Sequence, residues 1–148
     1  MTITEALIAE HTVFLSLFDE VERVLRDCTT AVEVRTLARI IEGALRSHAE
    51  AEANLAYLAL DHVLADNGPL KSLHHDHHEI DGRLEKAREA KTCAQARTLL
   101  AEAIAASREH FRCEERSVFP FLDKKLNAET LKALGQSRMR RDLELSAA

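Results

Sequence analysis

The chain has few of the residues that interrupt helices. Its 148 residues include four glycines, two prolines and no tryptophan. Because glycine and proline mark most tight turns, the chain can make few of them, and its elements must be long. Alanine, leucine, glutamate and arginine recur throughout, and these residues favour helices. The composition therefore predicts an all-α protein, and the length is near that of a single domain.

Cysteine is scarce as well. The three cysteines are Cys28, Cys93 and Cys113, an odd number that contains no Cys-x-x-Cys pair. This set argues against a disulfide framework and suits a reducing compartment. We therefore expect a cytoplasmic protein.

Long apolar runs and a basic surface are also lacking. No apolar stretch is long enough to span a bilayer, and the N-terminus has neither the basic region nor the apolar run of a signal peptide. The formal net charge is -5, and the only clearly basic run is RMRR, Arg138–Arg141. We therefore expect no membrane association and no nucleic-acid partner.

Four long segments carry apolar residues at helical spacing. Three of them open with a capping-box pattern, in which Thr is followed three residues later by Glu or Gln. These patterns are Thr2–Glu5, Thr30–Glu33 and Thr92–Gln95. The predicted helices cover residues 4–26, Thr30 to near Asp66, about Leu70 to Glu89, and Thr92 to Pro120, where proline breaks or kinks the helix.

The connections between these helices are short, which implies antiparallel neighbours. We therefore predict an up-down-up-down four-helix bundle over residues 1–126. A short helix through Leu134 and a charged tail would complete residues 127–148.

A histidine and a glutamate four residues apart occur in two of the predicted helices. His110 precedes Glu114, and a shift of 62 residues places His48 on His110 and Glu52 on Glu114. In a helix this spacing puts an imidazole and a carboxylate on one face, one turn apart, where both can reach the same ion. One such pair is weak evidence, but the second copy indicates that the two helices are repeats.

The other two predicted helices show the same duplication. A shift of 66 residues places the segment EHTVFLSLF, from Glu10, over DHHEIDGRL, from Asp76, so that His11 falls on His77. Two helix pairs related by duplication would pack with approximate two-fold symmetry. Four histidines and two glutamates would then meet at one level of the bundle interior, as six ligands for two metal ions.

The order and spacing of these residues resemble the hemerythrin-like HHE cation-binding domain from the start of the chain to about Leu126. The resemblance implies a non-haem di-iron centre, oxo- or hydroxo-bridged, inside a four-helix bundle. It also implies that Glu52 and Glu114 bridge the two irons. The terminal ligands that it implies are His11, His48, His77 and His110.

The sequence departs from the oxygen-carrying hemerythrins at two positions. Those proteins have a second histidine one turn before the His77 position, where this chain has Leu73, and an Asp five residues after the last histidine, where this chain has Glu at four. The pattern is closer to relatives that repair iron centres or sense iron and redox state. The resemblance therefore implies that the protein binds or reacts with oxygen, nitric oxide or peroxide, in the response to oxidative or nitrosative stress or in the repair of iron centres. The alternative is a module that senses iron or redox state, or that binds a partner, without turnover. For both functions we expect a monomer or a homodimer.

The donor set itself limits the metal. Imidazole and carboxylate suit iron, manganese, zinc or copper, and the absence of a thiolate argues against a closed structural zinc site. The ferritin-like di-iron bundle requires Glu-x-x-His on two helices, a spacing that this sequence does not contain. Iron in a hemerythrin-like bundle is therefore the preferred interpretation.

Further histidines compete for a place in the site. His74 lies one turn before His77 on nearly the same face, and it is either a fifth histidine or second-shell donor, or a partly exposed side chain. We expect His75 and His78 to be solvated. His62 lies about four turns beyond His48, on the order of 20 Å, which is too far to share the site.

Three other residues near the motifs are assigned to roles outside the ligand set. Cys113 points about 100° away from Glu114 and is expected to fill the core. Tyr57 projects nearly opposite His48 and is expected to be a packing residue. Glu115 does not share the face of the ligand histidines, so we expect it to matter less for metal binding than Glu114.

Overall fold

The computed structural model describes residues 1–61 and 68–146, and it is helical almost throughout. The first helix, α1 (Ile3–Leu25), is followed by α2 (Ala31–Ala51), which continues through a π-helical segment, η1 (Glu52–Tyr57), into α3 (Leu58–Asp61). The second half contains α4 (Gly68–Glu89) and α5 (Cys93–Cys113), which continues through η2 (Glu114–Val118) into α6 (Phe119–Lys125). The last helix is α7 (Ala128–Ser146).

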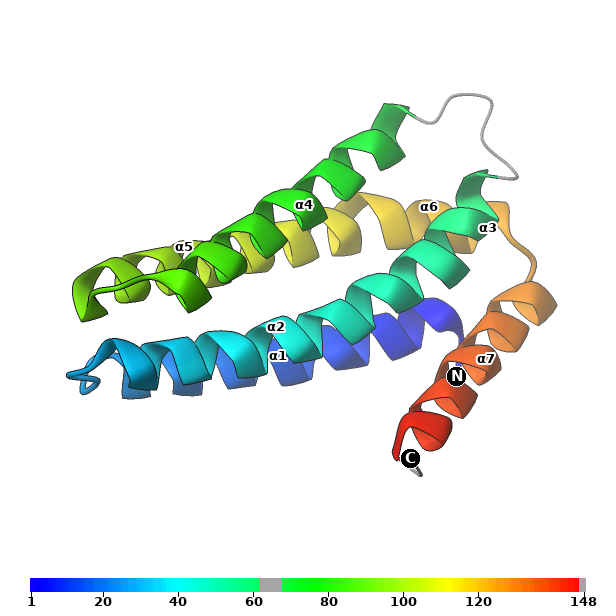
Figure 1. The fold of residues 1–148 in the computed structure, drawn as a ribbon. Helices are drawn as coiled ribbons and strands as arrows, with labels where there is room; N and C mark the ends of the chain where they lie inside the picture. Colours follow the sequence, from blue (N-terminus) through cyan, green and yellow to red (C-terminus); the bar gives the residue numbers. More distant parts are fainter. Residues whose placement is uncertain (62–67, 147–148) are drawn as a thin grey trace.

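The helices form two antiparallel pairs that pack into a bundle. The first pair is α1 with α2 and the second is α4 with α5, and the two pairs run side by side (Figure 1). The capping boxes at Thr2 and Thr30 are both present, and Thr92 accepts a hydrogen bond from the N–H of Gln95. The predicted all-α four-helix bundle is confirmed. The predicted end of the second helix, near Asp66, lies outside the described residues.

The fourth helix and the C-terminal helix both extend further than predicted. Pro120 does not end the fourth helix, which continues to Lys125. The proline ring would clash with the carbonyl of the residue four positions earlier, and the wider turn of η2 lies at that place. The C-terminal helix also extends well beyond Leu134, to Ser146, and packs across the end of α1 (Figure 1).

The apolar core consists of two clusters with a polar layer between them. One cluster includes Phe18 and Ile104, and the other includes Leu7 and Leu122, all fully buried. On α1, for example, His11 lies between Leu7 and the first cluster. The apolar clusters above and below the layer keep bulk water from the polar side chains that the four helices direct inward.

Candidate metal centre

The six residues predicted from the duplication meet inside the bundle in two overlapping groups. The residues of each group place their ligand atoms within 4.8 Å of one another. The first group is His11, His48, Glu52 and Glu114, and the second is Glu52, His77, His110 and Glu114. We call His11 with His48 the first half-site and His77 with His110 the second half-site. Both groups contain the two glutamates, so each glutamate is close enough to serve a metal ion in either half-site.

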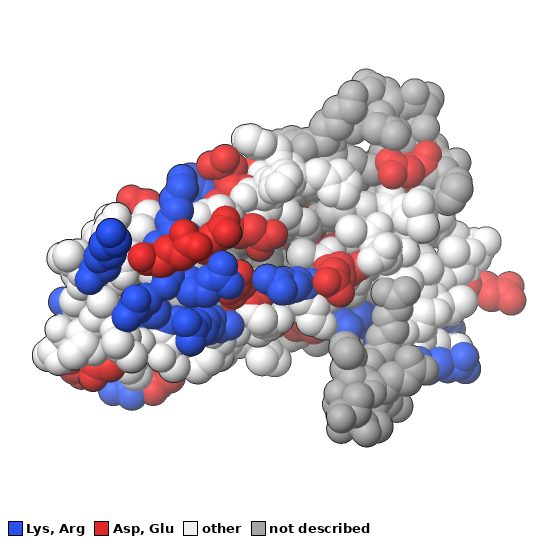
Figure 2. Space-filling model, in the orientation of Figure 1, with Lys and Arg blue, Asp and Glu red and all other residues white. Residues whose placement is uncertain are grey.

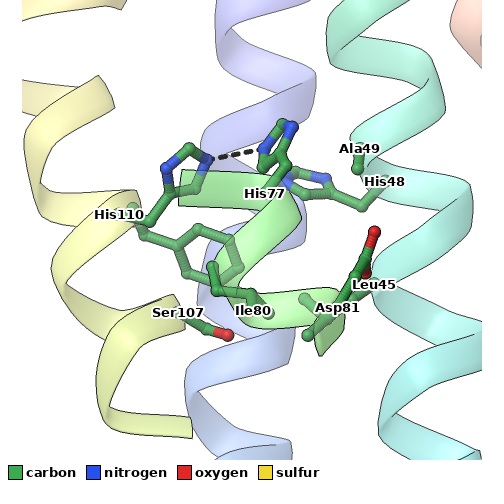
Figure 3. Close-up of a pocket in the computed structure, with 9 residues that line it drawn as sticks. Leu45, His48, Ala49, His77, Ile80, Asp81, Ser107 and His110 are labelled. Atoms are coloured by element: carbon green, nitrogen blue, oxygen red, sulfur yellow. Dashed lines mark hydrogen bonds between the residues drawn. The ribbon is translucent and has the colours of Figure 1, made fainter. Parts of the chain in front are cut away.

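The histidines of each half-site direct their Nε2 atoms toward each other. The Nε2 atoms lie 3.1 Å apart in the first half-site, between His11 and His48, and 2.7 Å apart in the second, between His77 and His110. Figure 3 shows the second pair. Two ligands that bind one ion at about 2.1 Å and at right angles to each other lie about 3 Å apart. The spacing in both half-sites therefore fits a shared ion.

Glu52 extends one carboxylate oxygen toward each half-site. Its Oε1 lies 2.9 Å from Nε2 of His48, and its Oε2 lies 3.2 Å from Nε2 of His77. Glu114 differs, because a single oxygen, Oε2, lies near both half-sites, 3.5 Å from His11 and 3.4 Å from His110. Glu52 thus has the geometry of a bridge through two oxygens, whereas Glu114 offers one oxygen to both positions.

Several polar atoms of the centre are buried without a hydrogen-bond partner. These atoms are both carboxylate oxygens of Glu52, Oε2 of Glu114 and Nδ1 of His110. Leaving a buried charged oxygen unsatisfied costs several kcal/mol or more, so such atoms are normally paired or bound to metal. The unpartnered glutamate oxygens and the imidazole nitrogens together fit divalent or trivalent metal ions of intermediate softness, such as iron.

Both glutamates stand at the first residue of a π-helical segment. Glu52 opens η1 and Glu114 opens η2, at positions that correspond in the duplication. A π turn bonds residue i to residue i+5 and is wider than an α turn, and such segments occur frequently at functional sites. Only η2 is followed by a proline, Pro120, so proline alone does not explain the pair. The π turns are a feature of the site that the helical pattern did not predict.

The wider turn brings Tyr57 to the centre, and the prediction that this side chain points away from it was wrong. Tyr57 is buried, and its hydroxyl donates a hydrogen bond to Oε1 of Glu114. In an α-helix Tyr57 would lie opposite His48, but each residue of the wider η1 advances less around the helix axis, so Tyr57 comes back toward the face of Glu52. The hydroxyl therefore occupies the oxygen of Glu114 that the two half-sites do not approach.

Tyr57→Phe is expected to lower the free energy of unfolding of the metal-free protein by about 1 to 3 kcal/mol. The reason is that Oε1 of Glu114 would lose its buried donor while the packing stays nearly the same. Urea unfolding followed by circular dichroism measures the change. Phe119 corresponds to Tyr57 in the duplication and is equally buried. Phe119→Leu is therefore the matched control, because it measures the cost of lost packing at the equivalent position without the loss of a hydrogen bond. Unchanged stability of Tyr57→Phe would contradict the assignment of this hydrogen bond.

Carboxylates outside the ligand set hold the remaining imidazole nitrogens. Glu10 accepts from Nδ1 of His48 at 2.7 Å, and Glu115 pairs with Nδ1 of His11 at 2.9 Å. Such partners fix the ring orientation and direct the other nitrogen toward a metal. Glu115 is therefore part of the support of the first half-site, a contact that the helical pattern did not predict, while its smaller effect on metal binding relative to Glu114 stays a prediction.

The second half-site has an acidic residue at the position of Glu10, but this residue does not form the hydrogen bond. Asp76 corresponds to Glu10 in the duplication, and its Oδ2 lies 3.6 Å from Nδ1 of His110, beyond hydrogen-bond distance. The alignment of EHTVFLSLF with DHHEIDGRL contained this signal, because it paired the two acidic residues that precede His11 and His77.

The electrostatic environment of the first half-site favours protonated imidazoles. Burial opposes protonation of His11, but the nearby carboxylates of Glu114 and Glu52, 3.5 and 3.6 Å from its Nε2, outweigh burial and raise the pKa of His11 to about 9. Burial likewise opposes protonation of His48, but attraction to Glu52 and the hydrogen bond with Glu10 raise its pKa to about 10. A metal ion must therefore compete with protons for these two nitrogens.

His110 of the second half-site has the opposite bias. Burial and repulsion from His77 lower the pKa of His110 to about 4, so its imidazole is neutral at pH 7. Burial and repulsion from Glu52 raise the pKa of Glu114 to about 7. His110 thus favours the neutral imidazole, whereas His11 and His48 favour the protonated one.

A small cavity lies against the second half-site. Its volume is ≈ 20 Å³, enough for about one water molecule. The lining residues are Leu45, His48, Ala49, His77, Ile80, Asp81, Ser107, His110 and Phe111 (Figure 3). The cavity therefore combines apolar side chains with imidazoles from both half-sites.

The other candidate residues lie outside the two groups. His74 is exposed and packs edge-on against the ring of Tyr57, with 5.4 Å between ring centroids. His75 and His78 are exposed, as predicted. Cys113 is exposed, so the prediction that it fills the core was wrong. The prediction for His62 falls outside the described residues.

The surface carries charges of both signs. Figure 2 shows acidic and basic side chains in adjacent rows over α2 and α4, toward the end of the bundle that lies away from α7. Arg88, for example, contacts both Glu42 on α2 and Glu85 on its own helix. Within the described part of the chain, no helix is both long and apolar enough to cross a bilayer.

Comparison with known proteins agrees with this geometry. The sequence model of the family described as Hemerythrin HHE cation binding domain matches residues 2–122. The matched range contains all six residues of the two groups and ends before α7. No curated protein and no solved structure matched the chain.

Proposed function

The chain belongs to the hemerythrin HHE cation-binding family, and we propose that it binds two iron ions in the buried centre and uses them to bind or react with a small molecule. The observation that carries the proposal is that two groups of ligand atoms share both glutamates. The small-molecule classes that we propose are oxygen, nitric oxide and peroxide. The free cysteines favour a cytoplasmic location.

We assign the ligands by half-site. His11 and His48 would hold one ion, His77 and His110 the other, and Glu52 and Glu114 would bridge them. Residues 1–126 then supply every ligand, and residues 127–148 form a C-terminal segment attached to that unit. When bound, iron supplies a change of oxidation state and open coordination positions.

The chain's own residues determine what can reach the centre. Phe111 stacks on the ring of His11, with 3.9 Å between centroids, and closes the first half-site from the side of the first core cluster. The second half-site adjoins the cavity of ≈ 20 Å³ and includes His77, whose side chain is 16% exposed. A molecule of two or three atoms that enters this cavity would contact imidazoles from both half-sites. The size of the cavity excludes larger substrates without movement of the helices.

His74 bears on the choice between oxygen carriage and reaction. Oxygen-carrying hemerythrins have a histidine at the position of Leu73, and here His74, the nearest alternative, is exposed and outside both groups. Each ion would then have two histidines and the shared glutamates, which leaves open positions on both. We therefore propose that the protein reacts with its ligand and does not carry oxygen reversibly.

An anaerobic titration with Fe²⁺, followed by exposure to oxygen, nitric oxide or peroxide, tests the proposal. We expect two ions per chain, and an optical spectrum that changes with nitric oxide or peroxide. After oxygen is added and removed, the spectrum of the ferrous protein should fail to return. His74→Ala should leave both results unchanged. Saturation at one ion would overturn the two-ion centre, whereas a fully reversible oxygen spectrum would overturn only the assignment to reaction over carriage.

A further inference from the structure

The C-terminal helix reaches the metal centre through two ionic contacts. Arg138 on α7 donates from Nε to Oε1 of Glu10 at 2.8 Å and from Nη2 to Oε2 at 3.2 Å. The same Oε2 accepts the hydrogen bond from Nδ1 of His48 at 2.7 Å. Arg138 is only 6% exposed, although its run in the sequence was predicted to belong to a charged tail. A continuous path of contacts therefore links α7 through α1 to a ligand on α2.

A glycine seats α7 close enough for this path to form. A Cβ atom at Gly135 would lie 2.5 Å from the carbonyl oxygen of Met1 and 2.8 Å from the carbonyl carbon of Thr2. These are backbone atoms at the start of α1, so a larger residue would push the two helices apart. Gly135 and Arg138 are three residues apart and lie on one face of α7. Close docking and the ionic contact are thus features of the same helix face.

The second half-site has no equivalent support in the described part of the chain. Asp76 stands where Glu10 stands in the duplication, but its side chain is 41% exposed and it lies 3.6 Å from His110. Among the described residues, no lysine or arginine forms an ion pair with Asp76. The two half-sites correspond in the duplication, but among the described residues only the first has such an ionic contact with α7, which lies beyond the range matched to the family.

We propose that Arg138 is a positioning residue for the first half-site, so that docking of α7 tunes metal binding there and not at the second half-site. The guanidinium holds both oxygens of Glu10, which fixes the carboxylate on Nδ1 of His48. Glu10 in turn fixes the tautomer and ring orientation that direct Nε2 of His48 to the ion. The inference rests on the proposed two-ion centre.

The coupling must act in both directions. If docking of α7 strengthens metal binding at the first half-site, then metal binding must strengthen the docking of α7 by the same factor. The position of α7 would then report whether the first half-site is occupied. Such a helix could present or withhold a surface in response to metal, which connects the centre to the sensing alternative.

Arg138→Gln is the first test, with Arg140→Gln as the matched control. Arg140 lies on the same helix, is exposed, and its replacement removes the same charge. In an anaerobic calorimetric titration with Fe²⁺, we expect Arg138→Gln to weaken one of the two binding steps by about 10-fold, with the other step within about twofold of wild type. Arg138→Lys should recover part of the loss, because lysine keeps the charge but not the two-point contact. Gly135→Ala should weaken the same binding step although the arginine at position 138 is still present, because the larger residue disturbs the docking of α7.

Hydrogen exchange of the wild-type protein supplies a measurement that needs no variant. Fe²⁺ should slow exchange of the α7 amides, and in Arg138→Gln this protection should largely disappear. Equal binding steps in Arg138→Gln and Arg140→Gln, or α7 exchange that is indifferent to metal in wild type, would overturn the inference. A wild-type protein that fails to bind two ions would overturn the proposed function instead, and the two failures are therefore distinguishable.

Discussion

Glu52→Ala is expected to abolish binding of both metal ions, whereas Glu50→Ala should leave two ions per chain. Glu52 is fully buried and directs one oxygen to His48 and the other to His77, so its loss removes a ligand from each half-site at once. Loss of a supporting residue typically weakens metal affinity 10- to 100-fold. The loss of a bridging ligand should exceed that, to about 100-fold or more at each step. Metal analysis after reconstitution with Fe²⁺ measures the result.

The control for this prediction follows from the structure. Glu50 lies two residues away on the same helix and is exposed, so its replacement changes the charge without touching the centre. Glu115 is a poor control because it pairs with Nδ1 of His11. Glu52→Gln keeps the side-chain volume and removes the carboxylate, so a loss of both ions in this variant as well would assign the effect to the missing ligand and not to lost packing. A Glu52→Ala protein that keeps one ion at wild-type affinity would refute the bridging role.

The six candidate ligands could be predicted because regular α-helix carries most of the chain. The spacing of four between His48 and Glu52 holds up to the first residue of η1, and the same is true of His110 and Glu114 before η2. Among the histidines of α4, the duplication indicated His77 because it is the one that aligns with His11. The choice is consistent with Ile80, one turn later on that face, being buried.

The residues that were missed lie where that regularity ends. Nothing in a 3.6-residue period predicts a π turn, so Tyr57 was assigned to the wrong face. Cys113 is exposed because a rotation of about 100° from Glu114 carries it out of the interior. In both cases the error follows from the geometry of single residues and not from the fold.

Contacts between helices were beyond the reach of the pattern for a different reason. Glu10 adjoins His11 in sequence, but its carboxylate crosses to His48 on the next helix. Its partner Arg138 lies 128 residues away and depends on the close seating at Gly135. Such contacts are determined by the distance between helix axes and by the path of the last connection, which a periodic pattern does not contain.

Removal of metal is expected to lower the melting temperature of the protein by roughly 10 °C or more. Each ion present at about 100 times its Kd stabilises the folded state by about 2.7 kcal/mol, so two ions contribute on the order of 5 kcal/mol. For a chain of this size, 1 kcal/mol corresponds to about 2 to 4 °C. The structural reason is that two carboxylates are buried side by side: without metal the oxygens of Glu52 form no regular hydrogen bond and have only histidine nitrogens near them, and burial and repulsion from Glu52 raise the pKa of Glu114.

Circular dichroism of the iron-loaded protein before and after a chelator measures the global effect, and Tyr57 gives a local one. The chain has one tyrosine and no tryptophan, so its ultraviolet emission reports on the hydroxyl that bonds to Glu114. Chelation should shift that emission at temperatures below the melting transition, while the helix signal is still intact. Glu52→Ala serves as the control, because a protein that binds no metal should not respond to the chelator. A wild-type melting temperature that is the same with and without metal would contradict the prediction, since it would mean that the buried carboxylates are satisfied by the protein alone.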